Sequence, residues 1–135
     1  MKPKRYMLDT DVFSYLVDGR HPEVRARALK AKSIAISAIT AAEVEFGARK
    51  KGSARLCSLI GVFKEMYPVV EWTDAMCEAY ADIRLALESV GTPIGDLDML
   101  IAAAARQGDY VLVTNNVAHF SRVPGLKIEN WVKNG

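Results

Sequence analysis

Cysteine, histidine and long apolar runs are all scarce in this chain of 135 residues. The two cysteines, Cys57 and Cys77, have no zinc-site spacing, so we expect reduced thiols rather than a disulfide. No stretch approaches the roughly 18 apolar residues of a membrane span, and the basic start lacks the apolar segment of a signal peptide. The sequence therefore predicts a cytoplasmic protein without a membrane segment.

The two histidines, His21 and His119, lie in no motif that would pair them. A ribonuclease of the two-histidine type needs one histidine as base and another as acid, so that chemistry is not expected. We expect His119 to be a surface residue or to support a nearby site.

Half of the residues are hydrophobic, and neither repeats nor linkers interrupt the pattern. Domains commonly contain roughly 100 to 200 residues, so this length suits one domain with a substantial core. We therefore expect a single domain over residues 1–135.

The net charge of +2 conceals an asymmetry along the chain. Residues 1–64 contain 13 Lys or Arg and 6 Asp or Glu, whereas residues 65–135 contain 5 and 10. A basic half beside an acidic half suits a protein that guides a polyanion toward a metal-loaded pocket. The basic residues can equally be solvated helix faces, and the charges alone leave both interpretations open.

Short apolar runs alternate with helical patterns along the chain. Strands are expected at 5–8, 33–36 and 110–113, with a closing edge strand at 128–131. Helices are expected at 12–17, 22–32, 41–51, 55–66, 73–90 and 96–107. Strands that alternate with helices predict βαβ units, and hence an α/β fold around a parallel sheet.

The helix expected at 73–90 has an apolar stripe. Its members recur at steps of four and three residues, and they are Met76, Tyr80, Ile83, Leu87 and Val90. Such a stripe is either part of the core or a face for a partner.

Acidic residues stand where strands end or helices begin, which is where open α/β sheets bind ligands. Asp9 follows the first strand, Glu43 lies in the segment after the second, and Asp98 lies in the first turn of the last helix. Asp98 shares a helical face with small apolar residues, so it should point inward. Two of these acids also have an ordinary structural interpretation: Asp9 as a turn residue, and Glu43 as the partner of Thr40 in a capping box.

Convergence of these carboxylates would require bound protons or a metal ion. At a separation of ~4 Å, each like-charge pair costs about 4 kcal/mol at an effective dielectric constant near 20. Ligands that are all oxygen favour hard cations, so Mg²⁺ is expected, with Mn²⁺ as a substitute. Such ions activate water and orient a phosphodiester, and the predicted reaction is metal-assisted hydrolysis.

Four segments of the chain carry a family resemblance that covers nearly its whole length. They are Met7-Leu8-Asp9-Thr10-Asp11, Ser37-Ala38-Ile39-Thr40 through Glu43, Gly95-Asp96-Leu97-Asp98, and Val113-Thr114-Asn115-Asn116. In this order and spacing the chain resembles the PIN-domain nucleases and, within that group, the VapC-type toxins of bacterial toxin–antitoxin pairs.

The resemblance implies a PIN-like three-layer α/β/α domain with a central parallel sheet of about five strands. It also implies a Mg²⁺-dependent endoribonuclease that cuts structured RNA, tRNA in several cases, by metal-activated water. The family's metal-binding acids fall on Asp9, Glu43 and Asp98, and its small polar residue falls on Thr10.

Three positions depart from the family pattern. Asn116 is a further candidate catalytic residue and stands where many relatives have a fourth acid. Its amide can bind a metal ion or a metal-bound water, but it brings no charge to hold a second ion. Asp11 replaces a common Asn, and Asp96 is an extra acid, so either could compensate as a secondary ligand. The spacing favours Asp98 over Asp96 as the ligand, and Asp96 is expected to cap the helix.

The resemblance also implies partners. Members are held inactive by a co-expressed VapB-type antitoxin, and an antitoxin arginine that reaches the acids could replace the charge of the metal. Members usually form homodimers, for which the amphipathic helix at 73–90 is a candidate surface.

Two other functions stay open. Asp9-Thr10-Asp11 also resembles the haloacid-dehalogenase-like phosphatases, in which the first Asp is a nucleophile, although Phe13 departs from that pattern. The other is a PIN-like module that binds RNA or protein without catalysis, which the loss of an acid would favour.

Overall fold

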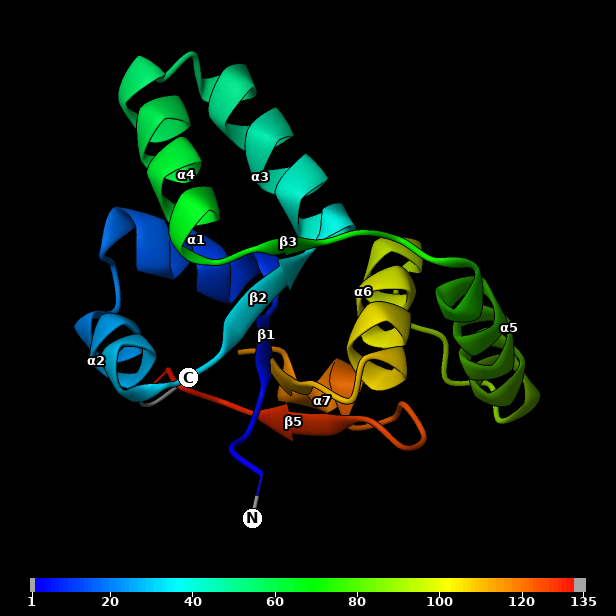
Figure 1. The fold of residues 1–135 in the computed structure, drawn as a ribbon. Helices are drawn as coiled ribbons and strands as arrows, with labels where there is room; N and C mark the ends of the chain where they lie inside the picture. The colour runs from blue at the N-terminus through cyan, green and yellow to red at the C-terminus, as the bar shows by residue number, and fades with distance from the viewer. Residues whose placement is uncertain (1, 133–135) are drawn as a thin grey trace.

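The computed structural model describes residues 2–132, which form a sheet covered by helices on both faces (Figure 1). The sheet has five strands in the order β3-β2-β1-β4-β5, and all neighbouring strands within the described residues are parallel. The strands are β1 (Tyr6–Leu8), β2 (Ile34–Ser37), β3 (Val69–Val70), β4 (Val111–Val113) and β5 (Lys127–Glu129). The helices are α1 (Thr10–Asp18), α2 (Pro22–Lys30), α3 (Ala38–Lys51), α4 (Ala54–Met66), α5 (Asp74–Ser89), α6 (Asp96–Gln107) and α7 (Val117–Phe120).

The side chains of the central strands point alternately to two apolar cores. Met7 and Leu112 pack with residues of α5, α6 and α7, whereas Leu8, Ile36 and Val113 pack with residues of α1 to α4. Successive residues of a strand face opposite sides, so a parallel sheet buried on both faces needs strands that are apolar throughout. The expected three-layer α/β/α fold with about five parallel strands is confirmed.

The apolar stripe of α5 belongs to the core. Met76, Ile83 and Leu87 are buried against α6, beside which α5 lies in Figure 1. Val90 is the exception, because it follows the end of the helix and is 69% exposed. Since these side chains are already covered, the stripe is not a face for a partner.

Two short elements escaped prediction. Strand β3 has two residues, and α7 has four, so neither is long enough to show a hydrophobic period. The expected edge strand at 128–131 is instead Lys127–Glu129.

The cysteines and the helices also bear on disulfides and membrane spans. Cys57 and Cys77 are both free thiols. Within residues 2–132, every helix is too short or too polar to cross a membrane.

Candidate active site

The ends of three neighbouring strands meet at one edge of the sheet. Asp9 follows β1 and is the N-cap of α1, Ser37 ends β2 and caps α3, and Thr114 follows β4. Helix α6 also begins at this edge, with Asp98 in its first turn. Helix N-termini carry unpaired N–H groups and partial positive charge, so this edge is suited to anions such as carboxylates and phosphates.

Asp9 is the most buried acid of the site, with 5% of its surface exposed. The Thr10 backbone N–H donates to Oδ1 at 2.7 Å, and the Thr114 hydroxyl donates to Oδ2 at 2.8 Å. Burial nevertheless raises the pKa of the Asp9 carboxyl to about 6, and the charges of Asp98 and Asp11 add to the rise. Both hydrogen-bond donors are neutral, so neither of them supplies a positive charge to balance the ionised Asp9 carboxylate.

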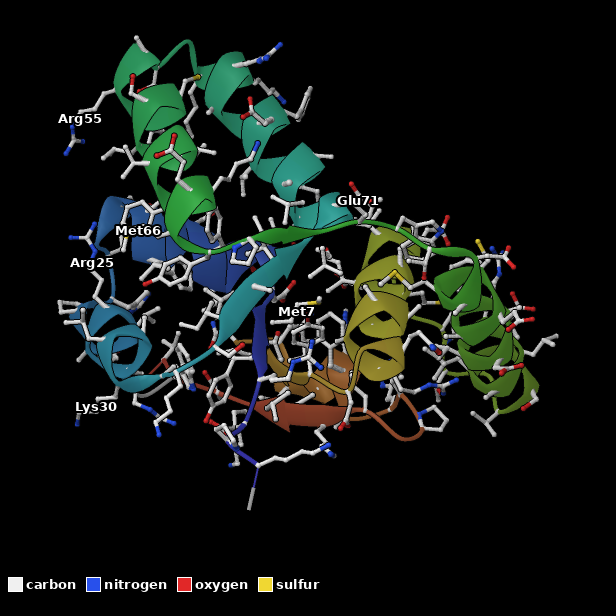
Figure 2. All side chains as sticks on the ribbon, in the orientation of Figure 1. Met7, Arg25, Lys30, Arg55, Met66 and Glu71 are labelled. Carbon is white, nitrogen blue, oxygen red and sulfur yellow. The ribbon has the colours of Figure 1, made fainter. Side chains whose placement is uncertain are left out.

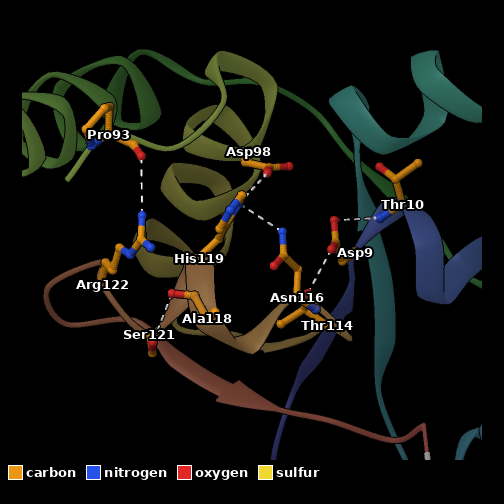
Figure 3. Close-up of polar contacts among 10 residues, drawn as sticks. All are labelled: Asp9, Thr10, Pro93, Asp98, Thr114, Asn116, Ala118, His119, Ser121 and Arg122. Carbon is orange, nitrogen blue, oxygen red and sulfur yellow. Dashed lines mark hydrogen bonds and ion pairs between the residues drawn. The ribbon is translucent and has the colours of Figure 1, made fainter. Parts of the chain in front are cut away.

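Asp98 faces the same space from α6. Figure 3 shows its carboxylate directed toward the region that Asp9 and Asn116 border. Its Oδ2 lies 3.8 Å from Nδ1 of His119, and the Asp98 side chain is 31% exposed. Burial raises the pKa of the Asp98 carboxyl, His119 opposes the rise, and Asp11 adds to it. Asp98 is thus half-buried rather than fully inward.

The hydroxyl groups of Thr10 and Thr40 connect Glu43 to the site. The Thr10 hydroxyl donates to Oε1 of Glu43 at 2.7 Å and lies 3.2 Å from the Thr40 hydroxyl. The predicted capping box of Thr40 and Glu43 is wrong, because Ser37 is the N-cap and its Oγ accepts from the Thr40 N–H at 3.0 Å. Helix α3 therefore begins three residues earlier than the expected start at residue 41, and Glu43 is free of a capping role.

Asp11 and Asp96, the two secondary candidates, are both exposed. Asp11 lies near enough to raise the pKa values of Asp9 and Asp98, so it belongs to the electrostatic field of the site. Asp96 is the first residue of α6, and the predicted capping role is wrong because Gly95 is the N-cap and no side chain caps the helix.

Asn116 connects the site to α7. Its backbone N–H donates to the Thr114 hydroxyl at 2.9 Å, and its side-chain nitrogen lies 2.9 Å from Nδ1 of His119 (Figure 3). His119 is thus partly exposed at the surface and lies beside two candidate site residues, Asn116 and Asp98. The role of Thr114 was not predicted, although its position directly after a buried strand is the same signal that singled out Asp9.

The acids are neighbours rather than a preformed ligand set. Among residues 2–132, no three Asp, Glu, His or Cys side chains lie close enough to hold a metal ion together. Their chemistry nevertheless fits a hard divalent cation, because the donors are carboxylate oxygens and buried Asp9 has only neutral hydrogen-bond donors. Burial is the main cause of the raised pKa of Asp9 and the charge of Asp98 adds to it, and a cation beside the two carboxylates would offset both.

A pocket extends from the site between α1, α3 and α4. Its volume is about 130 Å³, and apolar side chains that include Phe13, Val44 and Ile60 line it. Thr10 and Glu43 lie on its wall, as do the charged residues Arg20 and Lys51. The pocket therefore combines an apolar lining with a direct connection to the acids.

The charge asymmetry of the sequence is also an asymmetry in space. Figure 2 shows Arg25, Lys30 and Arg55 on the side of α2 and α4. Residues 65–135, which contain 10 acidic and 5 basic residues, include α5, α6 and α7 on the other side of the sheet. The site lies between these two sides, since Asp9 begins α1 and Asp98 belongs to α6.

Fold and site together define a class, the parallel α/β domains that gather carboxylates at the carboxyl edge of the sheet. Residues 6–126 match the PIN domain family. Ribonuclease VapC2 of Rickettsia felis is 35% identical over 95% of this chain and 98% of its own length. The tRNA(fMet)-specific endonuclease VapC of Salmonella typhimurium is 32% identical over 94% and 98%. The chain therefore belongs to the PIN-domain family, among its VapC ribonucleases.

A solved structure has the same fold. It is the VapBC2 complex of Rickettsia felis bound to a DNA fragment from its promoter, with a TM-score of 0.87 and 32% identity. The similarity covers 93% of this chain and 98% of that one.

The match to the PIN domain family also removes the support for a haloacid-dehalogenase-like phosphatase.

Proposed function

We propose that this protein is a metal-dependent endoribonuclease and the toxin of a toxin–antitoxin pair. One observation carries the proposal: buried Asp9 and half-buried Asp98 share an edge of a PIN-domain sheet, close enough for the charge of Asp98 to add to the raised pKa of Asp9. PIN-domain VapC nucleases are generally metal-dependent, and this acidic edge is where such a requirement would arise.

The residues divide the work as follows. Asp9 and Asp98 would hold Mg²⁺, or Mn²⁺ in its place, with Glu43, which accepts the Thr10 hydroxyl, as a further acid. When bound, such a cation supplies Lewis-acid chemistry that activates water and neutralises charge on a phosphodiester. The hydrogen bonds from Thr10 and Thr114 keep the Asp9 carboxylate in one orientation, so it need not reorganise during the reaction.

The proposed substrate is structured RNA, with tRNA as the favoured class. The relative from Salmonella typhimurium is named as an endonuclease specific for tRNA(fMet), which supports this class. The basic side of the molecule supplies the attraction that a phosphate backbone requires. Since the reaction acts on cellular RNA and both cysteines are free thiols, we place it in the cytoplasm.

The proposed partner is a VapB-type antitoxin, as in the VapBC2 complex of Rickettsia felis. The pocket between α1, α3 and α4 suits apolar side chains of such a partner, and Glu43 on its wall suits an arginine.

We also propose a homodimer. The expected surface is α5, whose apolar stripe is buried in the core, so a dimer would use outward residues of this helix such as Leu85, which is 68% exposed.

A binding module without catalysis is the second candidate. Asn116 favours it, because this amide stands where many relatives have a fourth acid. The acids Asp9, Glu43 and Asp98 are nevertheless present at the same edge, and these favour the nuclease.

Cleavage of RNA by the purified protein, free of antitoxin, separates the two candidates. We expect discrete fragments with Mg²⁺ and none with EDTA. Asp98→Asn should lower the rate by more than about 100-fold, since even outer-shell partners of a metal are worth roughly 10- to 100-fold. Asp96→Asn is the matched control on the same turn of α6 and should cut normally. Equal cleavage by both variants would contradict the proposal, and no cleavage by the parent protein would favour the binding module.

A further inference from the structure

We propose that Phe46 on α3 forms a base-binding subsite, in which an unpaired base of the RNA substrate stacks on its ring. The inference rests on the proposed function, in which this protein cuts RNA. It adds a binding position outside the acidic edge of the sheet, and it predicts that the enzyme needs an unpaired nucleotide close to the bond that it cuts.

Phe46 differs from the other aromatic residues in its exposure. Among residues 2–132 every other aromatic residue is buried or half-buried, whereas Phe46 is 66% exposed. Tyr15 and Trp72, for example, pack against the two apolar cores. A single exposed apolar side chain is ordinary in a folded protein, so the case for a subsite depends on what lies beside the ring.

The position of Phe46 on α3 brings it close to the acids. Phe46 follows Glu43 by three residues and Ile39 by seven, so these side chains share one face of the helix. Ile39 packs against the core that contains α6, and Glu43 accepts the Thr10 hydroxyl at 2.7 Å. In Figure 1, α3 extends away from the carboxyl edge of the sheet. Phe46 therefore lies about 4.5 Å along the helix axis from Glu43, on the face that borders the site.

A cation accompanies the ring. Nζ of Lys50 lies 5.8 Å from the centroid of the Phe46 ring. Among residues 2–132, Lys50 forms no ion pair, whereas its neighbour Arg49 pairs with Glu45 at 3.5 Å, as Lys64 does at 3.6 Å. The charge of Lys50 is therefore available to a phosphate group.

An aromatic ring beside a cation suits single-stranded nucleic acid. Proteins that bind single strands combine rings on which bases stack with cations that contact the backbone. Phe46 supplies the ring and Lys50 the cation. A base inside an RNA helix is covered by its neighbours, so only an unpaired base can lie on the ring. The subsite thus selects loops, bulges or ends, and stacking accepts any of the four bases.

The surroundings of the ring favour RNA over a protein partner. The core of a protein interface contains several apolar side chains and few charges. Phe46 is the one large apolar side chain of α3 that is exposed, and Glu45, Arg49 and Lys50 are its charged neighbours along the helix.

Binding of an RNA hairpin, measured in an Asp98→Asn background that keeps the RNA intact, tests the subsite. Phe46→Leu should weaken binding by roughly 5- to 150-fold, the effect of losing one base–aromatic stack, and leave the salt dependence unchanged because no charge is lost. Phe46→Tyr should bind like the parent protein. Lys50→Gln should instead reduce the slope of log affinity against log salt concentration by roughly 1. Leu29→Ala is the control, since Leu29 is 84% exposed beside Lys30 on α2.

Fluorescence reports stacking directly. The hairpin should quench the emission of Phe46→Trp, after subtraction of the signal that Trp72 and Trp131 give in the parent protein. A blunt RNA duplex with the sequence of the stem should not quench it, because its bases are paired. Leu29→Trp should respond to neither RNA.

The outcomes separate this inference from the proposed function. Equal hairpin affinity of Phe46→Leu and the parent protein, or equal losses in Phe46→Leu and Phe46→Tyr, would overturn the subsite and leave the nuclease intact. Conversion of a dimer to a monomer by Phe46→Leu in gel filtration would overturn it too and assign the ring to a protein interface. Failure of the folded parent protein to bind or cut RNA would overturn both.

Discussion

At the scale of single residues, the main feature of the site is the buried Asp9 carboxyl group, whose ionised form is disfavoured by burial. Desolvation of a carboxylate costs more than two neutral hydrogen bonds return, and the result is a pKa of about 6. Such a group gains from any cation that can reach it. The same burial that destabilises the charged form therefore prepares Asp9 to bind a metal ion.

The raised pKa of Asp9 predicts an unusual dependence of stability on pH in the metal-free protein. The folded state holds the proton more tightly than the unfolded chain, so this stabilisation is complete below about pH 4 and is lost as pH rises through 6. A shift from 3.8 to about 6 corresponds to about 3 kcal/mol at 1.36 kcal/mol per unit. Asp9→Asn should thus raise the free energy of unfolding at pH 7.5 by up to this amount.

Urea unfolding in EDTA between pH 4 and pH 8 checks this prediction. Asp11→Asn is the matched control, because it removes a neighbouring charge and leaves the buried carboxyl in place. If the unfolding free energies of Asp9→Asn and the parent protein followed the same pH curve, ionisation of the buried Asp9 carboxyl would not be what lowers the stability of the parent protein. Mg²⁺ should stabilise the parent protein at pH 7.5 and have no such effect on Asp9→Asn.

At the scale of elements, α3 shows how a cap places a functional side chain. The Ser37 hydroxyl accepts the Thr40 N–H and also donates to the Thr40 hydroxyl at 3.4 Å, which in turn lies beside Thr10. The Ser37 cap therefore fixes where α3 begins and also where the hydroxyl groups of Thr40 and Thr10 lie, the second of which donates to Glu43. We therefore expect a substitution of Ser37 to change the position of Glu43 in the site.

Two serine caps permit a matched test of this link. Ser37→Ala and Ser53→Ala each remove an N-cap, of α3 and α4 respectively, and each should lower the free energy of unfolding by about 1 kcal/mol. Only Ser37→Ala should also slow RNA cleavage, by roughly 10-fold, the lower end of outer-shell effects. Equal cleavage rates in the two variants would show that the cap of α3 does not position Glu43.

Sequence patterns predicted most elements because their causes are local. Helix α6 was placed at its observed bounds, since its apolar period is strong and Gly95 and Gly108 flank it. The start of α3 was misplaced because Ser37 and Thr40 both fit an N-cap, and only the structure shows which hydroxyl accepts the helix N–H. The two-residue β3 depends on pairing with β2, a contact that no local pattern shows.

At the scale of the whole molecule, the acidic site lies between a basic side and an acidic side. Lys51 lies on the pocket beside the site, within the basic half of the sequence. Lys127 lies in the acidic half and pairs with Asp109 at 3.1 Å. These two lysines carry the same charge in opposite surroundings, so they allow the attraction for RNA to be located.

We expect Lys51→Glu to weaken RNA binding and Lys127→Glu to leave it nearly unchanged. Binding should be measured in an Asp98→Asn background so that the RNA stays intact. Loss of one phosphate contact should reduce the slope of log affinity against log salt concentration by roughly 1. Equal weakening by both substitutions would indicate a response to net charge rather than a binding surface.

The site itself was only partly predictable, for reasons of distance along the chain. Asp9, Glu43 and Asp98 were found because each follows a recognisable strand or opens a helix, and the family resemblance gave them roles. The hydrogen bond between Thr114 and Asp9 joins residues 105 positions apart. The contact between Asn116 and His119 depends on how the fold places α7 after β4. Sequence patterns contain neither contact.

The most direct test is a crystal of the protein soaked in Mn²⁺, with the ion located by its anomalous scattering. We expect a peak in contact with the carboxylates of Asp9 and Asp98, on the side of Glu43 and Thr10, and no peak there in crystals of Asp98→Asn. A peak bound elsewhere, or an empty acidic edge in well-ordered parent crystals, would contradict the assignment of this edge as the metal-dependent catalytic site.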